Sequence, residues 1–271
     1  MTTQENDSNI MEEQHEDGEL TDEMLNELAL QAQEEALRNP KKPKRYPFPK
    51  WTVWLMAIVL TFSTFSVIFE IYSIPAIEFL KTSTALSKDP IVQQQKESVV
   101  LVRTEDGKGT GFIISEDGYI LTNHHVIEDQ RNLFVSLATD DYYDATLIAS
   151  YPEIDTAILK INAENLPTLT LAERYELTAD EPIHFIGNPL SFTGIVNQGE
   201  MIDYTKLASW DELVLMIQAP VYRGNSGSPV FNKQEEVIGI VFATLKDEHH
   251  GKVGLVIPIE LVQEKLSQLN E

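Results

Sequence analysis

The stretch GTGFIISEDGYILTNHHVI, from Gly109 to Ile127, holds two short apolar runs joined by a turn and ends with two adjacent histidines. Asp117-Gly118 stands between the runs. This dipeptide is a strong hairpin signal, because glycine readily adopts the positive φ that a tight turn needs. The stretch therefore predicts two antiparallel strands, with the histidines placed where the second strand ends.

Runs of the same kind recur along the chain up to Ile259, and turn residues separate them. They are SVVLVRT (98–104), GTGFIIS (109–115), GYILTN (118–123), LFVSLA (133–138), YYDATLIASY (142–151), TAILKI (156–161), PIHFIG (182–187), IVNQGEMIDY (195–204), LVLMIQA (213–219), SPVFN (228–232), EVIGIVFATL (236–245) and KVGLVIPI (252–259). About a dozen short strands at this spacing, without intervening helices, predict an all-β sandwich or barrels. Only the last segment, 259–271, has the apolar spacing of a helix, through Val262, Leu266 and Leu269.

The first 50 residues have a different composition. From Met1 to Asn39 the chain is acidic and poor in aromatic residues, with Arg38 as its only Lys or Arg. Such a segment buries too little apolar surface to offset chain entropy, which predicts a mostly disordered tail. Within it, residues 21–38 have helical spacing, with Thr21 or Asp22 as a candidate cap. This portion is either a helix that binds an unknown cytoplasmic partner or a solvated helix, and we favour the solvated helix.

An apolar run, WTVWLMAIVLTFSTFSVIF, covers residues 51–69 without a charged residue. A spanning helix needs about 20 apolar residues. The ten Val, Leu, Ile and Phe side chains contribute roughly −3 to −6 kcal/mol to insertion. We therefore predict a single transmembrane helix over 51–74. A buried core helix is disfavoured because the run is apolar on every face, and a cleaved signal peptide because 50 residues precede it.

The flanks of this run predict its orientation. Five basic residues precede or begin it: Lys41, Lys42, Lys44, Arg45 and Lys50. The positive-inside rule keeps such residues in the cytoplasm. We therefore expect a cell-membrane protein with a cytoplasmic tail over 1–50, a polar tether over 75–91 and an extracytoplasmic domain over 92–271.

Two features of composition exclude classes of function. The chain of 271 residues contains no cysteine, so a thiol nucleophile, a cysteine metal site and disulfides are all excluded. The net charge is −23, and no basic stripe interrupts it. Nucleic acid is therefore not expected as a partner.

The segment YRGNSGSPVF, from Tyr222 to Phe231, contains a serine between glycines. A serine hydroxyl attacks a carbonyl only if a base removes its proton and donors stabilise the oxyanion. The glycines allow a tight turn that exposes Ser226 and points the N–H groups of Gly224 and Ser226 toward one position. An ordinary turn without chemistry also explains the segment, when it is taken alone.

A base and an orienting carboxylate are needed beside the serine. Histidine is the side chain that titrates near neutral pH, and the candidates are His124, His125, His184, His249 and His250. The last two lie in a charged loop, and His184 alternates with apolar residues in a strand. The pair at 124–125 directly follows a strand. Asp155 opens an apolar strand, where it either orients a histidine or caps the preceding turn.

Six segments, in order, resemble the motifs of the trypsin-like serine proteases of the HtrA (Deg) group. They are GTGFIISEDGYILTNHHVI, DTAILKI, FIGNPLSFTGIVNQGEM, QAPVYRGNSGSPVF, EVIGIVFATL and VGLVIPI, between Val92 and Pro258. The resemblance implies a chymotrypsin-like double β-barrel with the active site between the barrels. It assigns catalysis to His125, Asp155 and Ser226, with the N–H groups of Gly224 and Ser226 as the oxyanion hole. His124 then takes the position of the asparagine in the family motif.

The resemblance also implies a specificity pocket, and the sequence departs from the family pattern at some positions. The positions matched to the pocket walls are Val221, Thr244 and Leu245, which predicts cleavage after small or medium apolar residues. Ser228 replaces a usual glycine and Arg223 a usual proline. Since the sequence stops after one short helix, we expect no PDZ module.

The sequence therefore predicts a membrane-anchored serine endopeptidase that cleaves unfolded or exposed segments of extracytoplasmic proteins through an acyl-enzyme, with no metal or cofactor. Its partners are polypeptide substrates and the membrane. Trimers occur in the resembled family, so a homo-oligomer stays open. The alternative is a catalytically silent, protease-like adaptor that holds peptides in its cleft. A purely structural anchor would leave the histidine, aspartate and serine unexplained.

Overall fold

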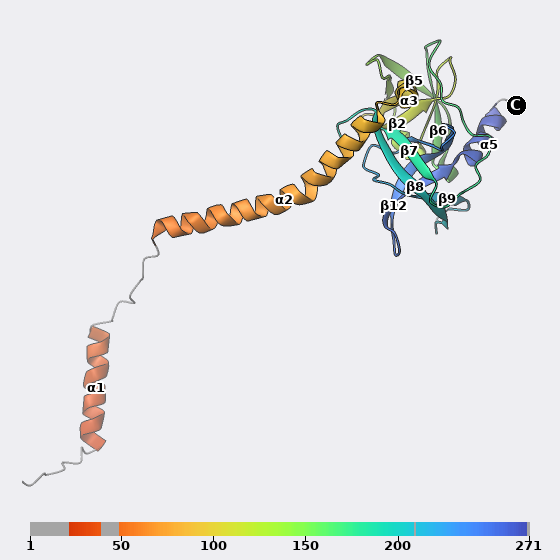
Figure 1. The fold of residues 1–271 in the computed structure, drawn as a ribbon. Coiled ribbons are helices and arrows are strands. Elements are labelled where there is room, and N and C mark those ends of the chain that lie inside the picture. Colours follow the sequence, from red (N-terminus) through yellow and green to blue (C-terminus); the bar gives the residue numbers. More distant parts are fainter. Residues whose placement is uncertain (1–21, 39–48, 209, 270–271) are drawn as a thin grey trace, which may run out of the picture. The chain divides into compact units, whose positions relative to one another are not determined.

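The computed structural model describes residues 22–38, 49–208 and 210–269 (Figure 1). The chain divides into two units, Met1–Thr64 and Phe65–Glu271. In the first unit, α1 (Asp22–Arg38) exposes its side chains from Glu23 onward, as expected of a solvated helix. The rest of the predicted disordered tail and most of the basic cluster lie outside the described residues.

Helix α2 (Lys50–Leu86) contains the segment predicted to span a membrane. Its large apolar side chains from Trp51 to Phe62 are exposed. The side chains of residues 65–78, which include the second half of the predicted span, lie outside the described residues. Within the described parts of the chain, no helix reaches the length and hydropathy needed to cross a membrane.

The segment 75–91, expected to be a polar tether, is mostly helical. Helix α2 continues to Leu86, and α3 (Pro90–Glu97) begins after a short turn. Asp89 caps α3 by accepting the N–H of Ile91 at 2.8 Å, and a proline at the first helical position lacks an N–H that would be unpaired there. The end of α2 contacts the second barrel, and composition alone does not reveal that contact.

Two closed antiparallel barrels form the rest of the second unit. The first has the order β1-β2-β3-β6-β5-β4 and the second β10-β11-β12-β9-β8-β7. The strands of the first barrel are β1 (Val99–Arg103), β2 (Lys108–Ile113), β3 (Tyr119–Thr122), β4 (Leu133–Ser136), β5 (Tyr142–Tyr151) and β6 (Thr156–Ile161). Those of the second are β7 (Pro182–Gly187), β8 (Ile195–Lys206), β9 (Leu213–Gln218), β10 (Pro229–Phe231), β11 (Val237–Asp247) and β12 (Gly251–Pro258). The prediction of an all-β double barrel is confirmed.

The hairpin predicted at Asp117-Gly118 joins β2 to β3. Phe112 pairs with Leu121, which sets the register. Gly118 has φ +101°, and a Cβ there would lie 2.6 Å from the carbonyl oxygen of Ile161. Both the turn conformation and the close approach of β6 therefore require glycine at this position.

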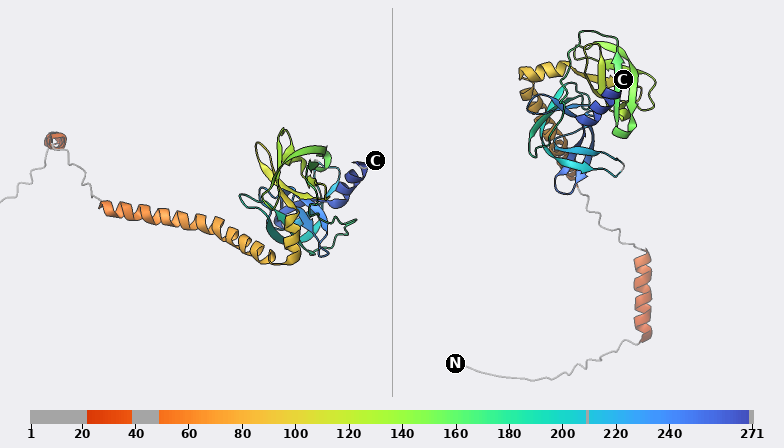
Figure 2. Two further views of the ribbon diagram at one scale, coloured as in Figure 1. Left: turned by 90° about the horizontal axis from the view of Figure 1, so that it is seen from above. Right: turned by 90° about the vertical axis from the view of Figure 1, so that its right-hand side faces the viewer.

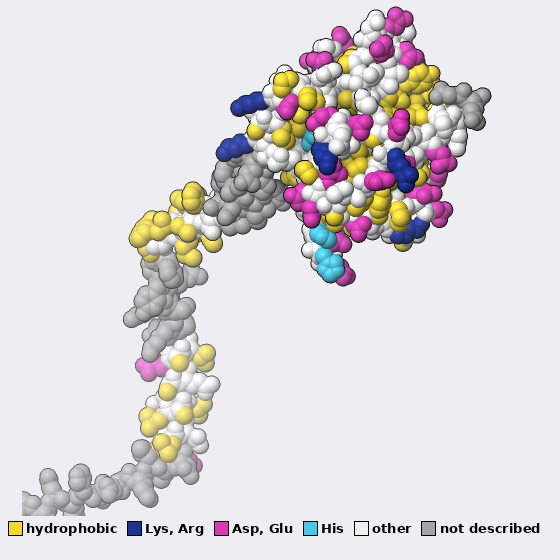
Figure 3. Space-filling view, turned by 45° about the vertical axis from the view of Figure 1, so that its right-hand side comes forward, with side chains coloured by type: hydrophobic (Ala, Val, Ile, Leu, Met, Phe, Trp, Pro, Cys, Tyr) yellow, Lys and Arg dark blue, Asp and Glu magenta, His cyan; other side chains and the backbone are white. Residues whose placement is uncertain are grey.

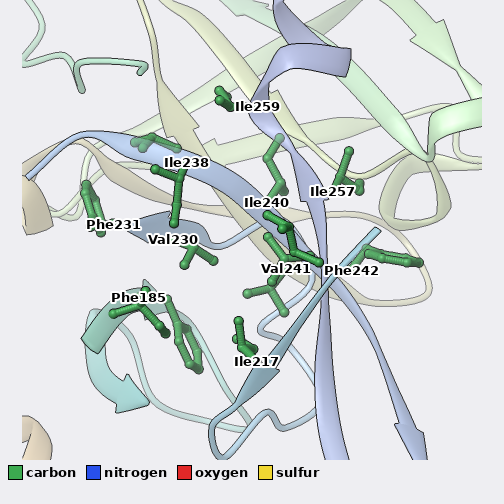
Figure 4. Close-up of a cluster of buried hydrophobic side chains, with 14 of the residues drawn as sticks. Phe185, Ile217, Val230, Phe231, Ile238, Ile240, Val241, Phe242, Ile257 and Ile259 are labelled. Carbon is green, nitrogen blue, oxygen red and sulfur yellow. The ribbon is translucent and has the colours of Figure 1, made fainter. Parts of the chain in front are cut away.

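One core cluster belongs to the first barrel, and a larger one joins the second barrel to Phe112, Leu121 and Ile158 of the first. Helix α5 (Ile259–Leu269) covers part of the second barrel. Figure 4 shows apolar side chains of the second barrel converging, among them Phe185, Ile240 and Ile257. Side chains alternate between the two faces of a strand, and a strand such as β1 is apolar along most of its length because both of its faces are buried. The predicted helix α5 is present at the surface near the C-terminal end (Figure 2). It buries Val262, whereas Leu269 is 41% exposed.

Acidic side chains are spread over the face of the barrels seen in Figure 3. The basic side chains on that face are set apart from one another. The acidic side chains on this face are thus distributed over the surface instead of being gathered in one patch.

Candidate active site

The predicted catalytic histidine lies in a short helix, α4 (His124–Ile127), which directly follows β3. The sequence prediction placed the histidine pair directly after a strand and did not include a helix there. Asn123 precedes α4 and is fully buried. Its Nδ2 donates to the carbonyl oxygen of Asp155 at 2.9 Å, and the N–H of His124 donates to the same oxygen at 3.1 Å. The start of α4 is therefore fixed to the residue that precedes β6.

Asp155 holds the side chain of His125 in place. It follows a 3-10 turn, η1 (Pro152–Ile154), adopts a left-handed conformation with φ +44°, and is 9% exposed. Its Oδ1 accepts the backbone N–H of His125 at 2.9 Å, and its Oδ2 lies 2.7 Å from Nδ1 of the same residue. Because a carboxylate oxygen only accepts, this network assigns the proton to Nδ1, which leaves Nε2 of the neutral ring as an acceptor. The structure thus brings these two predicted site residues into direct contact.

Ser226 lies in a turn between β9 and β10. The N–H of Asn225 donates to the carbonyl of Tyr222 at 3.0 Å. Gly224 and Gly227 flank the serine with φ +98° and +88°, a region that favours glycine. Among the described residues, the N–H groups of Gly224 and Ser226 have no hydrogen-bond acceptor. Both groups are thus free to bind an oxyanion.

Thr110 of β2 connects this turn to the first barrel. Its N–H donates to the carbonyl of Ser226 at 2.8 Å. Its hydroxyl donates to the carbonyl of Gly224 at 2.7 Å and accepts the N–H of Asn188 at 2.9 Å. The side chain is fully buried, so these hydrogen bonds do not compete with solvent. The serine turn is therefore held by both barrels.

The serine and histidine segments meet at Gly109. A Cβ on this glycine would lie 2.6 Å from a methyl group of Val126 and 3.3 Å from the carbonyl oxygen of Ser226. The residue after His125 and the backbone of Ser226 therefore flank the same position of β2. Glycine is required here because a side chain would separate the two segments.

The hydroxyl of Ser226 is not directed at His125. It donates to the carbonyl of Phe242 at 3.4 Å, and the described residues show no hydrogen bond between it and the imidazole. The structure thus joins two of the three predicted catalytic side chains directly. The third, Ser226, lies beside Gly109, where the serine and histidine segments meet, and its hydroxyl is turned toward β11.

The other histidines have different surroundings. Nδ1 of His124 lies 2.7 Å from Oγ of Ser150, which ties α4 to β5. His184 stacks on Phe231 with ring centroids 4.7 Å apart, and burial lowers its pKa, although nearby carboxylates oppose this. His249 and His250 are exposed.

The hairpin that carries those two exposed histidines is organised by Asp247. Hydrogen bonds, led by the one from the N–H of His250, lower the pKa of Asp247 to about 2. Across the described ranges, no group of three or more His, Asp or Glu side chains is placed to bind a metal ion.

The three residues matched to a specificity pocket are only partly together. Val221 is buried and lines a cavity of about 410 Å³ together with Lys252. Thr244 pairs with Gly254, and a Cβ on Gly254 would lie 2.8 Å from Cγ2 of Val221. Val221 and Thr244 therefore lie on one side of the sheet. Leu245 is the next residue of β11, so its side chain points to the other side.

Sequence reasoning missed Thr110 and Asn123 as residues of the site. Both lie inside motifs that were quoted for other residues, in GTG and TNHH. A polar side chain between glycines in an apolar strand was a usable signal for Thr110, because a buried hydroxyl needs partners. For Asn123 the sequence offered no such signal, because its role depends on the hydrogen bond from its Nδ2 to the carbonyl oxygen of Asp155, 32 residues away.

Two six-stranded barrels, with a hydrogen-bonded histidine and aspartate in the first and a glycine-flanked serine in the second, have the architecture of trypsin-like serine proteases. Residues 109–240 match the model of the trypsin-like peptidase domain. Residues 109–240 are thus similar to trypsin-like peptidase domains.

Relatives of the DegP type support this assignment. The chain is 36% identical over 196 residues to a probable periplasmic serine endoprotease DegP-like of Pseudomonas fluorescens, a match that covers 71% of this chain and 40% of the relative. It is 39% identical over 165 residues to a protein of the same description from Halomonas elongata, covering 59% and 35%. The chain thus spans well under half the length of these relatives.

Solved structures show the same fold. A serine endoprotease from Yersinia pestis superposes with a TM-score of 0.59 and 29% identity, covering 66% of this chain and 65% of that one. Rv3671c from M. tuberculosis H37Rv, in an inactive mutant form, superposes with a TM-score of 0.61 and 27% identity, covering 69% and 93%.

Proposed function

We propose that this protein is a serine endopeptidase in which Ser226 is the nucleophile, His125 the general base and Asp155 the residue that orients the base. The observation behind the proposal is that Asp155 accepts two hydrogen bonds from His125, one from its backbone N–H at 2.9 Å and one from its ring Nδ1 at 2.7 Å. This pair fixes both the tautomer and the direction of the imidazole. A structural histidine needs neither.

In the proposed reaction, the hydroxyl of Ser226 rotates away from Phe242 and donates to Nε2 of His125. Its oxygen attacks the substrate carbonyl while the imidazole takes the proton, and the N–H groups of Gly224 and Ser226 stabilise the oxyanion. The imidazolium then protonates the leaving amine, and the acyl-enzyme forms. Water attacks this ester with the same histidine as base, which releases the acid and restores the serine. Catalytic hydrogen bonds often tighten only when substrate binds.

We propose that the substrates are unfolded or exposed segments of polypeptides, cleaved after small or medium apolar residues. The described lining of the cavity at Val221 contains no Asp or Glu, so a substrate Arg or Lys would lack a carboxylate partner. A peptide library should be cut mainly after Val, Ala or Leu. Cleavage mainly after Lys or Arg would contradict this specificity.

The proposed location is the extracytoplasmic side of a cell membrane. The support is the uncharged run over 51–69 behind a basic cluster, and relatives described as periplasmic endoproteases. In this proposal, residues 51–74 anchor the chain, 1–50 lie in the cytoplasm and 92–271 form the protease domain. Carbonate extraction of membranes and protease accessibility of the domain in spheroplasts test it. A fully extractable protein would contradict the anchor.

The catalytic proposal is tested with a fluorophosphonate probe, which modifies only an activated serine, and with casein cleavage. Ser226→Ala should lower turnover by ~10⁶-fold if the three residues act as a unit, and should abolish labelling. Ser228→Ala is the matched control, because this serine lies two residues away and its buried hydroxyl has no partner among the described residues. The control should be labelled like the parent.

A second candidate function rests on the orientation of Ser226. Its hydroxyl donates to Phe242 and not to His125, as expected of a protease-like adaptor that binds peptides without cleaving them. A folded parent protein that binds casein peptides but is neither labelled nor able to cleave them would favour this adaptor over the peptidase.

A further inference from the structure

The C-terminal turns of α2 rest on the second barrel. Phe79 is 8% exposed and Ser83, four residues later on the same face, is 4% exposed. The hydroxyl of Ser83 accepts the N–H of Val196 in β8 at 3.0 Å. One turn further, Leu86 packs against the core of the barrel. The hydrogen bond of Ser83, one turn from Phe79, holds this part of α2 on the barrel surface.

Phe79 touches the segment that leads into the serine turn. Its ring meets that of Tyr222 edge to face, with centroids 5.0 Å apart and planes at 78°. This is a favourable aromatic geometry. The Tyr222 ring also contacts Lys252, whose Nζ lies 6.0 Å from the ring centroid. Among the described residues, Phe79 provides the aromatic contact of this ring.

Tyr222 begins the turn that presents the oxyanion donors. Its carbonyl accepts the N–H of Asn225 at 3.0 Å, and this hydrogen bond closes the turn around Gly224. The neighbouring carbonyls are held from outside: that of Val221 by Nζ of Lys252 at 3.3 Å, and that of Arg223 by the N–H of Leu190 at 2.9 Å. A shift of the Tyr222 ring would therefore move the peptide groups on which the N–H of Gly224 depends.

We propose that Phe79 is a positioning residue for the oxyanion hole: the end of α2 fixes Tyr222 through the ring contact and thereby fixes the turn before Ser226. This rests on the proposed function of that turn. This proposal gives the segment expected to be a tether a role in the efficiency of the enzyme. Removing one oxyanion donor costs about 10²–10³-fold in rate, so loosening its support should cost roughly tenfold.

The test compares Phe79→Ala, Phe79→Leu and Leu86→Ala with the parent in the full-length chain. Phe79→Ala should lower the rate of fluorophosphonate labelling roughly tenfold, and kcat for a peptide ester more than KM. Phe79→Leu retains apolar bulk, so it tests the loss of the ring if the alanine variant does not fold. Leu86→Ala is the control, because it weakens the same helix contact without touching Tyr222, and it should lower Tm but leave labelling near the parental rate.

Two further measurements separate positioning from a general loss of structure. In a double-mutant cycle, Tyr222→Ala combined with Phe79→Ala should lower the rate no further than one variant alone. Amide exchange at Asn225 should accelerate in Phe79→Ala, and this readout does not depend on activity. An unlabelled parent would contradict the proposed function, while exchange at Asn225 would still decide the coupling. Three results would overturn the inference. They are parental rates of labelling and amide exchange in both Phe79 variants, a loss of labelling in Leu86→Ala equal to that in Phe79→Ala, or additive losses of labelling rate in the double-mutant cycle.

Discussion

Replacing Thr110 with valine should weaken both the stability of the barrels and the predicted catalytic turn. Valine has nearly the shape of threonine but lacks the hydroxyl, which donates to Gly224 and accepts from Asn188. Both partners would be left without that hydrogen bond in a fully buried environment. The backbone N–H of residue 110, which donates to Ser226, remains in the variant.

The magnitude follows from the two hydrogen bonds. Each unsatisfied buried group costs about 1–3 kcal/mol, and the extra methyl group gains about 0.8 kcal/mol. The net loss in the free energy of unfolding is therefore about 1–5 kcal/mol. Because Gly224 also loses a contact that fixes its peptide plane, we expect the rate of fluorophosphonate labelling to fall by up to about 10²-fold, which is less than the cost of removing an oxyanion donor.

Thr122→Val is the matched control for this prediction. Thr122 is also a fully buried threonine in the first barrel, and its hydroxyl makes one hydrogen bond within the described residues, to the carbonyl of Thr110 at 2.7 Å. The same arithmetic gives a loss of about 0–2 kcal/mol. Urea unfolding gives the stabilities, and labelling at a temperature where both variants are folded gives the rates. Equal stability and equal labelling in the two variants would refute the role assigned to Thr110.

Three further changes have defined outcomes. Asp155→Asn should lower kcat by about 10⁴-fold with little change in stability, by analogy with this change in other Ser-His-Asp triads, because His125 would adopt the wrong tautomer; peptide kinetics would show it, and a loss under tenfold would contradict it. Gly227→Ala should prevent stable folding or cost several kcal/mol, as a Cβ at φ +88° would collide with the carbonyl of Thr110; a variant with parental Tm would contradict this. Burial lowers the pKa of His184, so below about pH 6.5 the unfolded chain binds a proton that the native state does not, and the free energy of unfolding falls as the pH decreases. In urea titrations from pH 8 to 5, His184→Gln should flatten this decrease. An unchanged slope would exclude His184 as its cause.

The strands were predictable because their signals are local. Alternating apolar residues, β-branched side chains and turn residues such as Asp117-Gly118 depend only on neighbouring positions. Accordingly, the runs at 142–151, 156–161 and 182–187 match β5, β6 and β7 to the residue. Helix α4 was missed because four residues at the end of a strand are too few for a helical period to appear in the sequence.

The site was only partly predictable. The resemblance led to His125 and Asp155, and the structure joins them by hydrogen bonds. It did not lead to the direction of the Ser226 hydroxyl, which depends on side-chain rotation at an atom 16 residues away in sequence, the carbonyl oxygen of Phe242. It also did not separate Leu245 from Thr244, since the two sides of a strand can be assigned only when the neighbouring strands are known.

The residues that hold the serine turn show why these contacts could not be predicted from the sequence. The hydrogen bond from Thr110 to Gly224 joins residues 114 positions apart, and the ring contact of Phe79 reaches Tyr222 from a helix outside the barrels. In the sequence, Thr110 signals only that its hydroxyl needs a partner, without saying which, and Phe79 resembles any apolar residue of the expected tether. Their roles arise only because two barrels and a helix meet at one turn. If that turn carries the oxyanion hole, its geometry is determined from three distant segments, and variants in each should lower labelling more than their effect on Tm alone predicts.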